Sequence, residues 1–450
     1  MREERREVVI EKLVAGGMGL ARLGDGGPAQ GVAGGPAQGE VVMVPRVAVG
    51  ERLVIAIDRT RRPARGRVLK MLDVASARVT PSCPVVERCG GCDWMHLDAD
   101  AQRAARLALI IDALPAIAKS VAIEYHAATP ARGRTRARWH AQTLKAHRDG
   151  VERMVLGYRE LGSNTIVEID ACPAIDPRLE EALVDARAIV AGAHGDGDVN
   201  VALGEGGRPV LALSFRGEIA PSGYREAEAR VSSGRLAGVQ IELEGARVPA
   251  TIGDPRPVAL AADGLPLRAP AFGFAQASEV GDAVLVARVV DRAAPAGKKV
   301  VELFAGSGNL TVALARDAAH VIAVELVRAA CDAARANLAA RGLAAKVRVT
   351  NGDADEFVIP AGTDVVVLDP PRAGARGATA RIAGSKAKRA VYVSCDPTTL
   401  GRDLATLIGA PDGCGGWQLM SLDAIDLFPD TSHVEVIATL DRLTTSKGSR

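Results

Sequence analysis

The sequence predicts an α/β fold in which the last third of the chain forms a doubly wound, mostly parallel sheet. Two observations support this prediction. From about Gly297 onward, short apolar runs alternate with stretches of helical periodicity. The runs are rich in valine and do not alternate with polar residues, which is typical of strands that are buried on both faces. In chain order they are KKVVELF, HVIAVEL, KVRVTN, DVVVLD, RAVYVS and HVEVIATL.

The preceding two thirds of the chain predict two smaller domains. In the first part, short β-rich runs alternate with glycine-rich turns, which indicates a small all-β barrel. A duplicated GGPAQG, at Gly26–Gly31 and Gly34–Gly39, predicts a flexible loop in this barrel. The middle part is strand-rich, apart from a helix expected over Asp98–Ile117 with Asp98 as its N-cap. The expected domains are residues 1–75, 76–265 and 266–450, and the helix could pack on the third of them.

Composition limits the class of protein. The 450 residues carry a formal net charge of only +2, but arginines cluster in Arg59–Arg67 and in Ala131–Arg148. Alternating arginines on a strand share one face, so the second cluster predicts a cationic stripe and a polyanionic partner. The charged N-terminus is no signal peptide, and no apolar run approaches the ~20 residues of a membrane helix. We therefore expect a cytoplasmic protein with no membrane partner, in which the seven cysteines are reduced.

A glycine turn follows the first strand of the predicted sheet, in VVELFAGSGNLT. The turn lacks the Lys-Ser/Thr of a phosphate-binding P-loop, and Thr311 replaces the third glycine of a dinucleotide-binding turn. The pattern E-x-F-x-G-x-G instead indicates an S-adenosylmethionine site, in which the backbone at Gly306 approaches the methionine and ribose portions. Glu325, which ends the second strand, is expected to grip the ribose hydroxyls, and Asp353 to accept a hydrogen bond from the adenine amino group.

A cysteine follows the fifth strand, where ligands bind in open α/β sheets. Taken alone, Cys395 could be an inert buried thiol or a nucleophile. Beside a methyl donor, a thiolate that adds to carbon-6 of uracil makes carbon-5 nucleophilic, and a base must then remove the carbon-5 proton. Glu435 at the start of the last strand is the candidate base, and His433 is a second one. Asp369 ends the fourth strand at the same edge.

Four other cysteines predict a metal centre. Cys83, Cys89 and Cys92 have the spacing C-x5-C-x2-C, and Cys172 follows at a distance. Four thiolates can bind either a 4Fe–4S cluster or a zinc ion, and spacing alone does not choose between them.

These motifs together resemble the RNA 5-methyluridine (uracil-5) methyltransferase family, in particular its members that act on 23S rRNA. The resemblance rests on ELFAGSGNLT, LDPPRAG, YVSCDPTTLGRDL and FPDTSHVEV in this order, and it extends to the N-terminal region and to GFAQAS. It implies a class I methyltransferase sheet, an N-terminal TRAM barrel of OB-like fold that binds RNA, and a central iron–sulfur domain. Two positions depart from the family pattern, because Ser278 and Asp396 each stand where it usually has asparagine.

The resemblance also assigns residues and partners. Cys395 is implied as the nucleophile and Glu435 as the base, and the cysteine ligands are implied to hold 4Fe–4S rather than zinc. The implied substrate is a uridine of 23S rRNA, with the T-loop uridine of tRNA and RNA cytosine-5 methylation as alternatives, and we expect a monomer. The cofactor-binding residues implied are Gln276, Phe304, Gly306, Asn309, Glu325, Asp353 and Asp369.

Overall fold

The computed structural model describes residues 4–24, 39–127, 130–145, 152–409 and 416–443. The chain divides into two compact units. The first comprises Met1–Asp112 and Phe428–His433, and the second comprises Ala113–Leu427 and Val434–Arg450. The duplicated GGPAQG lies outside the described residues, except for its last glycine.

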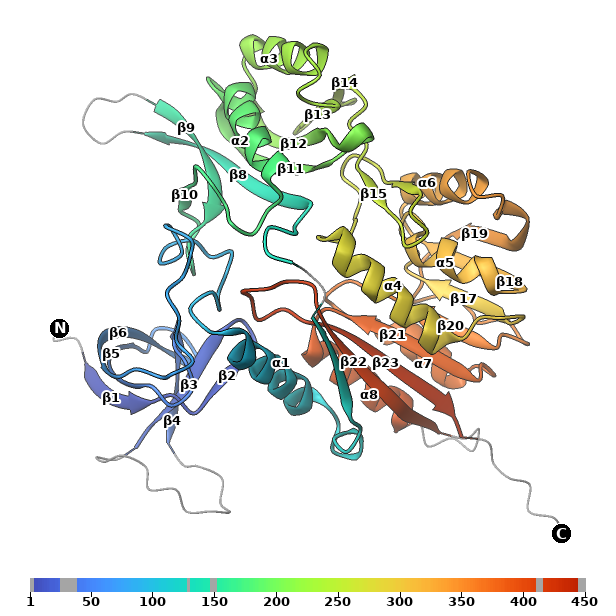
Figure 1. Ribbon diagram of the computed structural model, residues 1–450, viewed down its shortest axis with the longest axis horizontal. Coiled ribbons are helices and arrows are strands. Elements are labelled where there is room, and N and C mark those ends of the chain that lie inside the picture. Colours follow the sequence, from blue (N-terminus) through green and yellow to red (C-terminus); the bar gives the residue numbers. More distant parts are fainter. Residues whose placement is uncertain (1–3, 25–38, 128–129, 146–151, 410–415, 444–450) are drawn as a thin grey trace. The chain divides into compact units, whose positions relative to one another are not determined.

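The first unit contains a six-stranded sheet with the strand order β1-β5-β6-β4-β3-β2 (Figure 1). Neighbouring strands are antiparallel except β4 and β6, and one face of the sheet packs into an apolar core that includes Val42, Leu53 and Ile55. The β-rich sequence EVVIEKL, which begins at Glu7, is divided between the first two strands. The strands are β1 (Arg5–Val9), β2 (Lys12–Val14), β3 (Met18–Leu23), β4 (Glu40–Pro45), β5 (Arg52–Asp58) and β6 (Ala64–Asp73).

Helix α1 (Ala99–Ala113) follows the three clustered cysteines. Asp98 caps it as predicted, because its Oδ1 accepts a hydrogen bond of 2.8 Å from the Ala101 N–H. The helix ends at Ala113 rather than at the predicted Ile117, since Pro115 disfavours helical geometry at the residue before it. Its buried Arg106 donates to the Thr431 carbonyl at 2.8 Å, which fastens α1 to the segment Phe428–His433 of the same unit.

The second unit begins its central part with a seven-stranded sheet of order β10-β9-β8-β11-β12-β13-β14. All neighbours are antiparallel except β12 and β13, and α2 and α3 accompany this sheet. The elements are β8 (Arg136–Lys145), β9 (Glu152–Arg159), β10 (Ile166–Glu168), α2 (Pro177–Val190), β11 (His194–Leu203), η2 (Glu205–Gly207), β12 (Pro209–Glu218), α3 (Pro221–Ser232), β13 (Gly238–Leu243) and β14 (Ala250–Gly253).

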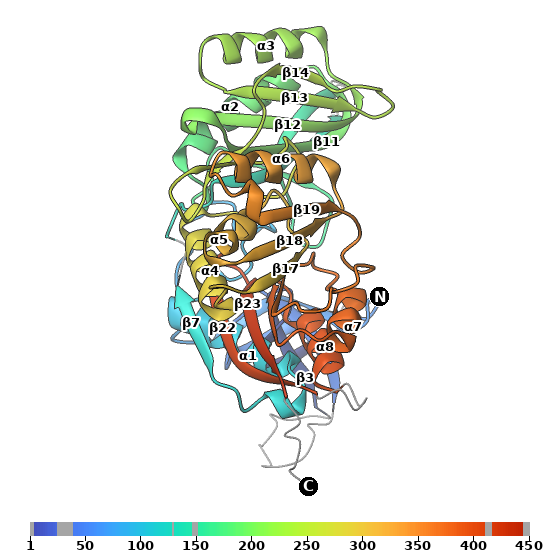
Figure 2. The ribbon, with the colours of Figure 1, turned by 90° about the vertical axis from the view of Figure 1, so that its right-hand side faces the viewer.

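The C-terminal part of the second unit is the predicted doubly wound sheet. Its strand order is β19-β18-β17-β20-β21-β23-β22-β7. Figure 2 shows α4, α5 and α6 on one face and α7 and α8 on the other. The strands are β7 (Ile123–Ala127), β17 (Lys299–Leu303), β18 (His320–Glu325), β19 (Val347–Asn351), β20 (Val365–Leu368), β21 (Arg389–Ser394), β22 (Trp417–Asp426) and β23 (Glu435–Arg442). The helices are α4 (Glu279–Ala293), α5 (Asn309–Asp317), α6 (Arg328–Ala339), α7 (Arg376–Gly384) and α8 (Pro397–Ile408). The second unit also contains two short 3₁₀ helices, η1 (Ala116–Ala118) and η3 (Ala344–Lys346), and a separate hairpin of β15 (Val258–Leu260) and β16 (Pro266–Arg268).

The register of this sheet brings several predicted site residues to one edge. Strands β17, β18, β19, β20 and β21 are parallel, so the residues that follow them share the carboxyl edge of the sheet. Strand β23 runs antiparallel to β21 and therefore begins at that edge, with Ser394 opposite Val436. None of the helices in the described part of the chain is long and apolar enough to cross a membrane.

Candidate active site

The glycine turn connects β17 to α5 through left-handed backbone. Phe304, Gly306 and Gly308 have φ of 62°, 56° and 89°. A side chain at Gly308 would be strained by this φ, and its Cβ would lie 3.3 Å from that of Ala334. Non-glycine residues rarely adopt such angles, so the conformation of Phe304 is held by its surroundings.

Glu325 holds the turn from the neighbouring strand. Its Oε2 accepts a hydrogen bond of 2.9 Å from the Gly306 N–H, and its Oε1 accepts one of 2.7 Å from the Val327 N–H. The carboxylate predicted to grip the ribose therefore lies against the glycine turn. Asp353, by contrast, lies exposed after β19, where its Oδ1 accepts from the Asp355 N–H at 2.9 Å.

Asn309 begins α5 and contacts a carboxylate that the sequence did not reveal. Its Nδ2 lies 2.8 Å from Oδ1 and 2.9 Å from Oδ2 of Asp282, in the first turn of α4. Asp282 is only 6% exposed, and burial raises the pKa of its carboxyl to about 7. Ser278, one of the two departures from the family pattern, caps the same helix by accepting from the Gly281 N–H.

Gln276 lies half-buried in the segment before α4, and an arginine of the central sheet holds this segment. The Arg136 guanidinium donates to the carbonyls of Gly273, at 2.5 Å, and Ala275, at 3.4 Å. The Thr135 N–H donates to the Ala277 carbonyl at 2.8 Å. Burial lowers the pKa of Arg136 because the charged guanidinium is removed from water.

The predicted arginine stripe is therefore wrong as a single cationic face. Strand β8 begins only at Arg136, so Arg132 and Arg134 precede the strand. Arg132 pairs with Glu180, and Arg136 faces the segment described above. Arg138 remains 62% exposed, although it lies 3.7 Å from Asp198.

Charged neighbours shift the pKa values of two predicted catalytic residues at the carboxyl edge, Cys395 and Glu435. Asp369 and Arg372 act on both of them. The pairing of β21 with β23 ends with Ser394 opposite Val436, so Cys395 directly follows this pair on one strand and Glu435 directly precedes it on the other. Burial, followed by the charge of the Glu435 carboxylate, raises the pKa of the Cys395 thiol to about 11, and the Arg372 guanidinium opposes both effects. Glu435 is 4% exposed, and burial followed by the charge of Asp369 raises its pKa. The pKa of Asp369 is raised by burial and by the charge of Asp282.

Two sets of hydrogen bonds position the loops around the thiol. Asp396, the second departure from the family pattern, caps α8 by accepting from the N–H groups of Thr398 at 2.8 Å and Thr399 at 3.0 Å. The buried Asp403 accepts from the Tyr392 hydroxyl at 2.7 Å and from the Ala375 N–H at 2.8 Å. Asp403 thereby ties the loop that carries Arg372 to α8.

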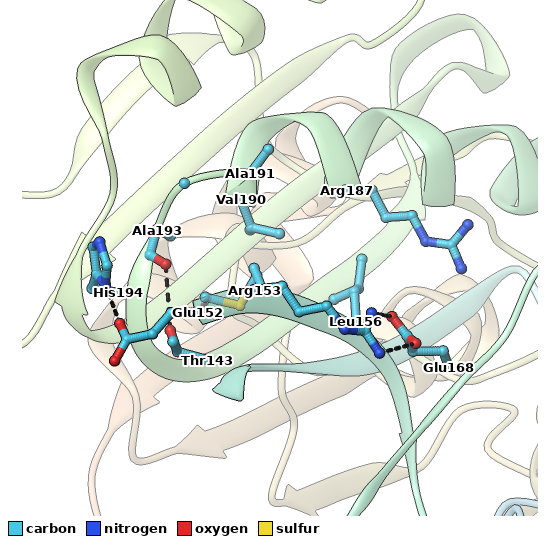
Figure 3. A pocket seen from close by; sticks show the side chains of 12 residues that line it. Thr143, Glu152, Arg153, Leu156, Glu168, Arg187, Val190, Ala191, Ala193 and His194 are labelled. Atoms are coloured by element: carbon cyan, nitrogen blue, oxygen red, sulfur yellow. Dashed lines mark hydrogen bonds and ion pairs between the residues drawn. The ribbon is translucent and has the colours of Figure 1, made fainter. Parts of the chain in front are cut away.

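Two other polar groupings of the second unit lie away from this edge. A pocket of about 380 Å³ lies between β8, β9, β10 and α2, and four of its charged side chains form two pairs, Arg153 with Glu168 and His194 with Glu152 (Figure 3). No candidate site residue lines it. The second grouping, Glu124, His126 and Asp423, could offer three ligands to a metal. Two arginines, Arg288 and Arg292, already bind Asp423 and Glu124, so the grouping is an ion-pair network.

Comparisons with known proteins identify the family. A family model described as tRNA (Uracil-5-)-methyltransferase matches residues 361–443, which include Asp369, Cys395 and Glu435. A model described as Conserved hypothetical protein 95 matches residues 290–386. The 23S rRNA (uracil(1939)-C(5))-methyltransferase RlmD of Edwardsiella ictaluri is 31% identical over 417 residues, which cover 90% of this chain and 91% of that protein. The chain belongs to the RNA uracil-5 methyltransferase family.

Further members of the family match at similar levels. RlmD of Salmonella typhi is 31% identical over 414 residues, covering 90% of this chain and 92% of its own length. An uncharacterized RNA methyltransferase of Gloeobacter violaceus is 31% identical over 462 residues, which cover 97% of this chain and 96% of that protein. Among solved structures, the Pyrococcus abyssi tRNA (uracil-54, C5)-methyltransferase in complex with S-adenosyl-L-homocysteine superposes with a TM-score of 0.71 at 20% identity, over 97% of this chain and 100% of that one. This likeness confirms the α/β methyltransferase fold.

The four cysteines of the predicted metal centre are distributed over both units of this family member. Cys83, Cys89 and Cys92 belong to the first unit and Cys172 to the second, and all four are free of disulfides. The Gly91 N–H donates to Cys89 Sγ at 3.4 Å, and Arg46 donates to the backbone carbonyls of Cys89 and Cys92. Metal-bound thiolates commonly accept N–H···S hydrogen bonds, so the environment of the Cys89 sulfur fits a metal ligand.

The buried carboxyls predict that the free protein loses stability as the pH rises. Burial raises the pKa of Glu302 to about 8 and that of Asp282 to about 7. Above about pH 5 the unfolded chain has released these protons while the folded chain retains them, so the free energy of unfolding falls up to about pH 8, by at most about 1.4 kcal/mol per pH unit for each group. Urea titrations between pH 5.5 and 8.5 measure this slope.

The Glu302→Gln variant supplies the matched test of this prediction. Its neutral amide should flatten part of the slope and raise the denaturation midpoint at pH 8. Carboxyls whose pKa is lowered, such as Asp364, lose their contribution only below about pH 4, outside the window. A free energy of unfolding that rises from pH 5.5 to 8.5 would contradict the assignment of raised pKa values.

Proposed function

We propose that this chain methylates carbon-5 of a uridine in RNA, with S-adenosylmethionine as the methyl-donor substrate and 23S rRNA as the target. The observation that carries this proposal is the pairing of β21 with β23, which ends at Ser394 and Val436 and supports Cys395 and Glu435 as neighbours at the edge where the glycine turn also follows its strand. A thiol, a carboxylate and a donor site in one place are the groups that uracil-5 methylation requires.

The donor is assigned to the glycine turn and its neighbours. Glu325, whose Oε2 accepts from the Gly306 N–H, is proposed to accept hydrogen bonds from the ribose hydroxyls. Asn309 lies at the N-terminus of α5, next to the turn. Asp369 and Gln276 are proposed to line the space that the donor and the target base would share. The full set proposed for the donor is Gln276, Phe304, Gly306, Asn309, Glu325, Asp353 and Asp369.

The reaction follows from the chemistry of uracil. The Cys395 thiolate forms a bond to carbon-6, and the electrons of the 5,6-double bond move to the carbonyl at carbon-4 as an enolate. Carbon-5 then takes the methyl group, and the electrons of the broken S–CH₃ bond remain on the donor sulfur. Glu435 removes the carbon-5 proton, the 5,6-double bond forms again, and the bond from carbon-6 to Cys395 breaks.

Arg372 is proposed to favour the thiolate. Burial and the neighbouring carboxylate raise the pKa of Cys395, and the Arg372 guanidinium lowers it. Glu435 must be ionised when it acts as a base, although burial favours its neutral form. The positive charge of a bound sulfonium would favour both ionised groups, so we expect the thiol to become reactive only when the donor is bound.

The test uses transcripts of 23S rRNA fragments and of tRNA, incubated with the protein and S-adenosylmethionine and then analysed by nucleoside mass spectrometry. The fragment that spans uracil 1939, the position named in the relatives, should yield 5-methyluridine, and the same fragment with cytosine at that position should not. Product in the tRNA transcript alone would move the substrate to the T-loop uridine, and 5-methylcytidine would overturn the proposed base.

The rest of the chain is proposed to serve RNA binding and stability. Residues 1–75 are assigned as a TRAM barrel, residues 76–265 as a central domain with a cysteine cluster, and residues 266–450 as the catalytic domain. The six-stranded sheet with its own core supports the first assignment. With rRNA as its substrate, the protein is proposed to act in the cytoplasm, as a monomer.

Cys83, Cys89, Cys92 and Cys172 are proposed to hold a 4Fe–4S cluster with a structural role. Protein purified without oxygen should contain about four irons per chain and absorb visible light broadly. The Cys92→Ser variant should lose this iron and unfold at a lower temperature. One zinc per chain in a colourless protein would instead assign the alternative metal.

A further inference from the structure

Neither of the two helices needs the contact between Asp282 and Asn309 to cap its N-terminus. Asp282 is buried in the first turn of α4, a helix that already has Ser278 as its cap. Asn309 opens α5, whose N-cap is Gly308. A buried carboxylate is costly unless its charge is compensated. Burial and the negative charge of Glu279 raise the pKa of Asp282, and the hydrogen bond from the Asn309 amide lowers it only in part.

The contact fixes which end of the Asn309 amide is available. Since Nδ2 lies 2.8 and 2.9 Å from the two carboxylate oxygens, it is the donor of this pair and Oδ1 points elsewhere. Oδ1 is buried and has no hydrogen-bond partner among the described residues. An acceptor left in this state costs about 1–3 kcal/mol, which a ligand that brings a donor would recover.

The surroundings of Asn309 Oδ1 favour a hydrogen-bond donor that carries a positive charge. Asp282 and Asp369 repel each other's charge, and Asp369 in turn raises the pKa of Glu302. The negative charge of these buried carboxyls lies beside the turn at which the donor substrate is proposed to bind. S-adenosylmethionine carries an α-ammonium group on its methionine portion, and this group has only donors and a positive charge.

We propose that Asp282 is a positioning residue that holds Oδ1 of Asn309 toward the α-ammonium of S-adenosylmethionine. This inference rests on the proposed function, because it takes the glycine turn to be the donor site. Asp282 acts on the ligand through Asn309 and through its charge. The bound ammonium also compensates the buried carboxylate, in agreement with the raised pKa that Asp282 has in the free protein.

The test compares two ligands that differ only in the group invoked. S-adenosylhomocysteine carries the α-ammonium, and its deamino analogue has hydrogen in its place. Isothermal titration of the full-length protein should show that S-adenosylhomocysteine binds more tightly. In Asp282→Asn, which keeps the shape of the side chain, this preference should fall about tenfold, since a charge-assisted interaction is lost. In Asp282→Ala, the preference for S-adenosylhomocysteine over the deamino analogue should fall by at least as much.

Two controls separate positioning from a structural role. Asp291→Asn alters an exposed carboxylate of the same helix and should leave both affinities unchanged. Equal weakening of both ligands by the Asp282 variants, or no weakening of either, would overturn the inference, as would wild-type protein that binds both ligands equally or neither. Because the readout is binding, wild-type protein that shows the ammonium preference but makes no 5-methyluridine would contradict the proposed function alone.

Discussion

Replacement of Cys395 by alanine should reduce the formation of 5-methyluridine by at least about 10⁴-fold, because no other group among those placed at this edge can add to carbon-6. The loss is expected to be chemical rather than structural. The thiol is half-buried, and removal of one sulfur atom should cost little stability. Cys395→Ala should therefore bind S-adenosylhomocysteine as wild type does. Initial rates with the 23S rRNA fragment measure the effect.

A covalent probe identifies the same sulfur directly. RNA with 5-fluorouridine at the target position cannot lose fluorine as a proton, so the adduct with Cys395 should persist on a denaturing gel. Wild-type protein with S-adenosylmethionine should give this shifted band, and Cys395→Ala should give none. Cys331→Ala, which removes a buried cysteine of α6, should still give it. A shifted band with Cys395→Ala would assign the nucleophile elsewhere.

Much of the edge that carries the site could be predicted because its signals are local. Valine-rich runs separated by helices predict the strands, and the strand order agrees with the predicted doubly wound sheet. The glycine motif predicts a tight turn after the first strand, and in the structure Gly306 of this turn donates to Glu325. The side-by-side placement of Cys395 and Glu435 needed the register of two strands whose pairing is not local. The place of β7 in this sheet was missed for the same reason, since β7 pairs with β22 across about three hundred residues. Strand β22 was also missed, although it pairs with β23, the next strand along the chain.

Asp282 and Arg136 show what local patterns cannot supply. Asp282 reads in sequence as an ordinary acidic residue in the first turn of a helix, where the helix dipole favours it. Its burial and its contact with Asn309 arise only when α4 packs against α5. Arg136 reads as part of a cationic stripe, but its guanidinium binds backbone carbonyls of the segment that carries Gln276. In both cases a distant partner decides the role of the residue.

Replacement of Glu435 by glutamine should stop the reaction after the methyl group has been transferred. The amide cannot accept the carbon-5 proton, so the 5,6-double bond does not form again and the bond to Cys395 remains. We expect turnover to fall by about 10³-fold or more, while a covalent complex of protein and natural RNA accumulates. With S-adenosylmethionine labelled in its methyl group, this complex should carry the label on a denaturing gel.

The variant should remain folded, since the environment of Glu435 already favours a neutral group. Burial and the charge of Asp369 raise the pKa of the carboxyl, and the neutral amide has nearly the same shape. Glu435→Asp provides the matched control, because it keeps an ionisable carboxyl and should retain measurable turnover. Release of 5-methyluridine by Glu435→Gln at the wild-type rate would contradict its role as the base. His433 would then be the next candidate, and a labelled adduct that accumulates only in a His433→Ala variant would assign proton removal to the imidazole.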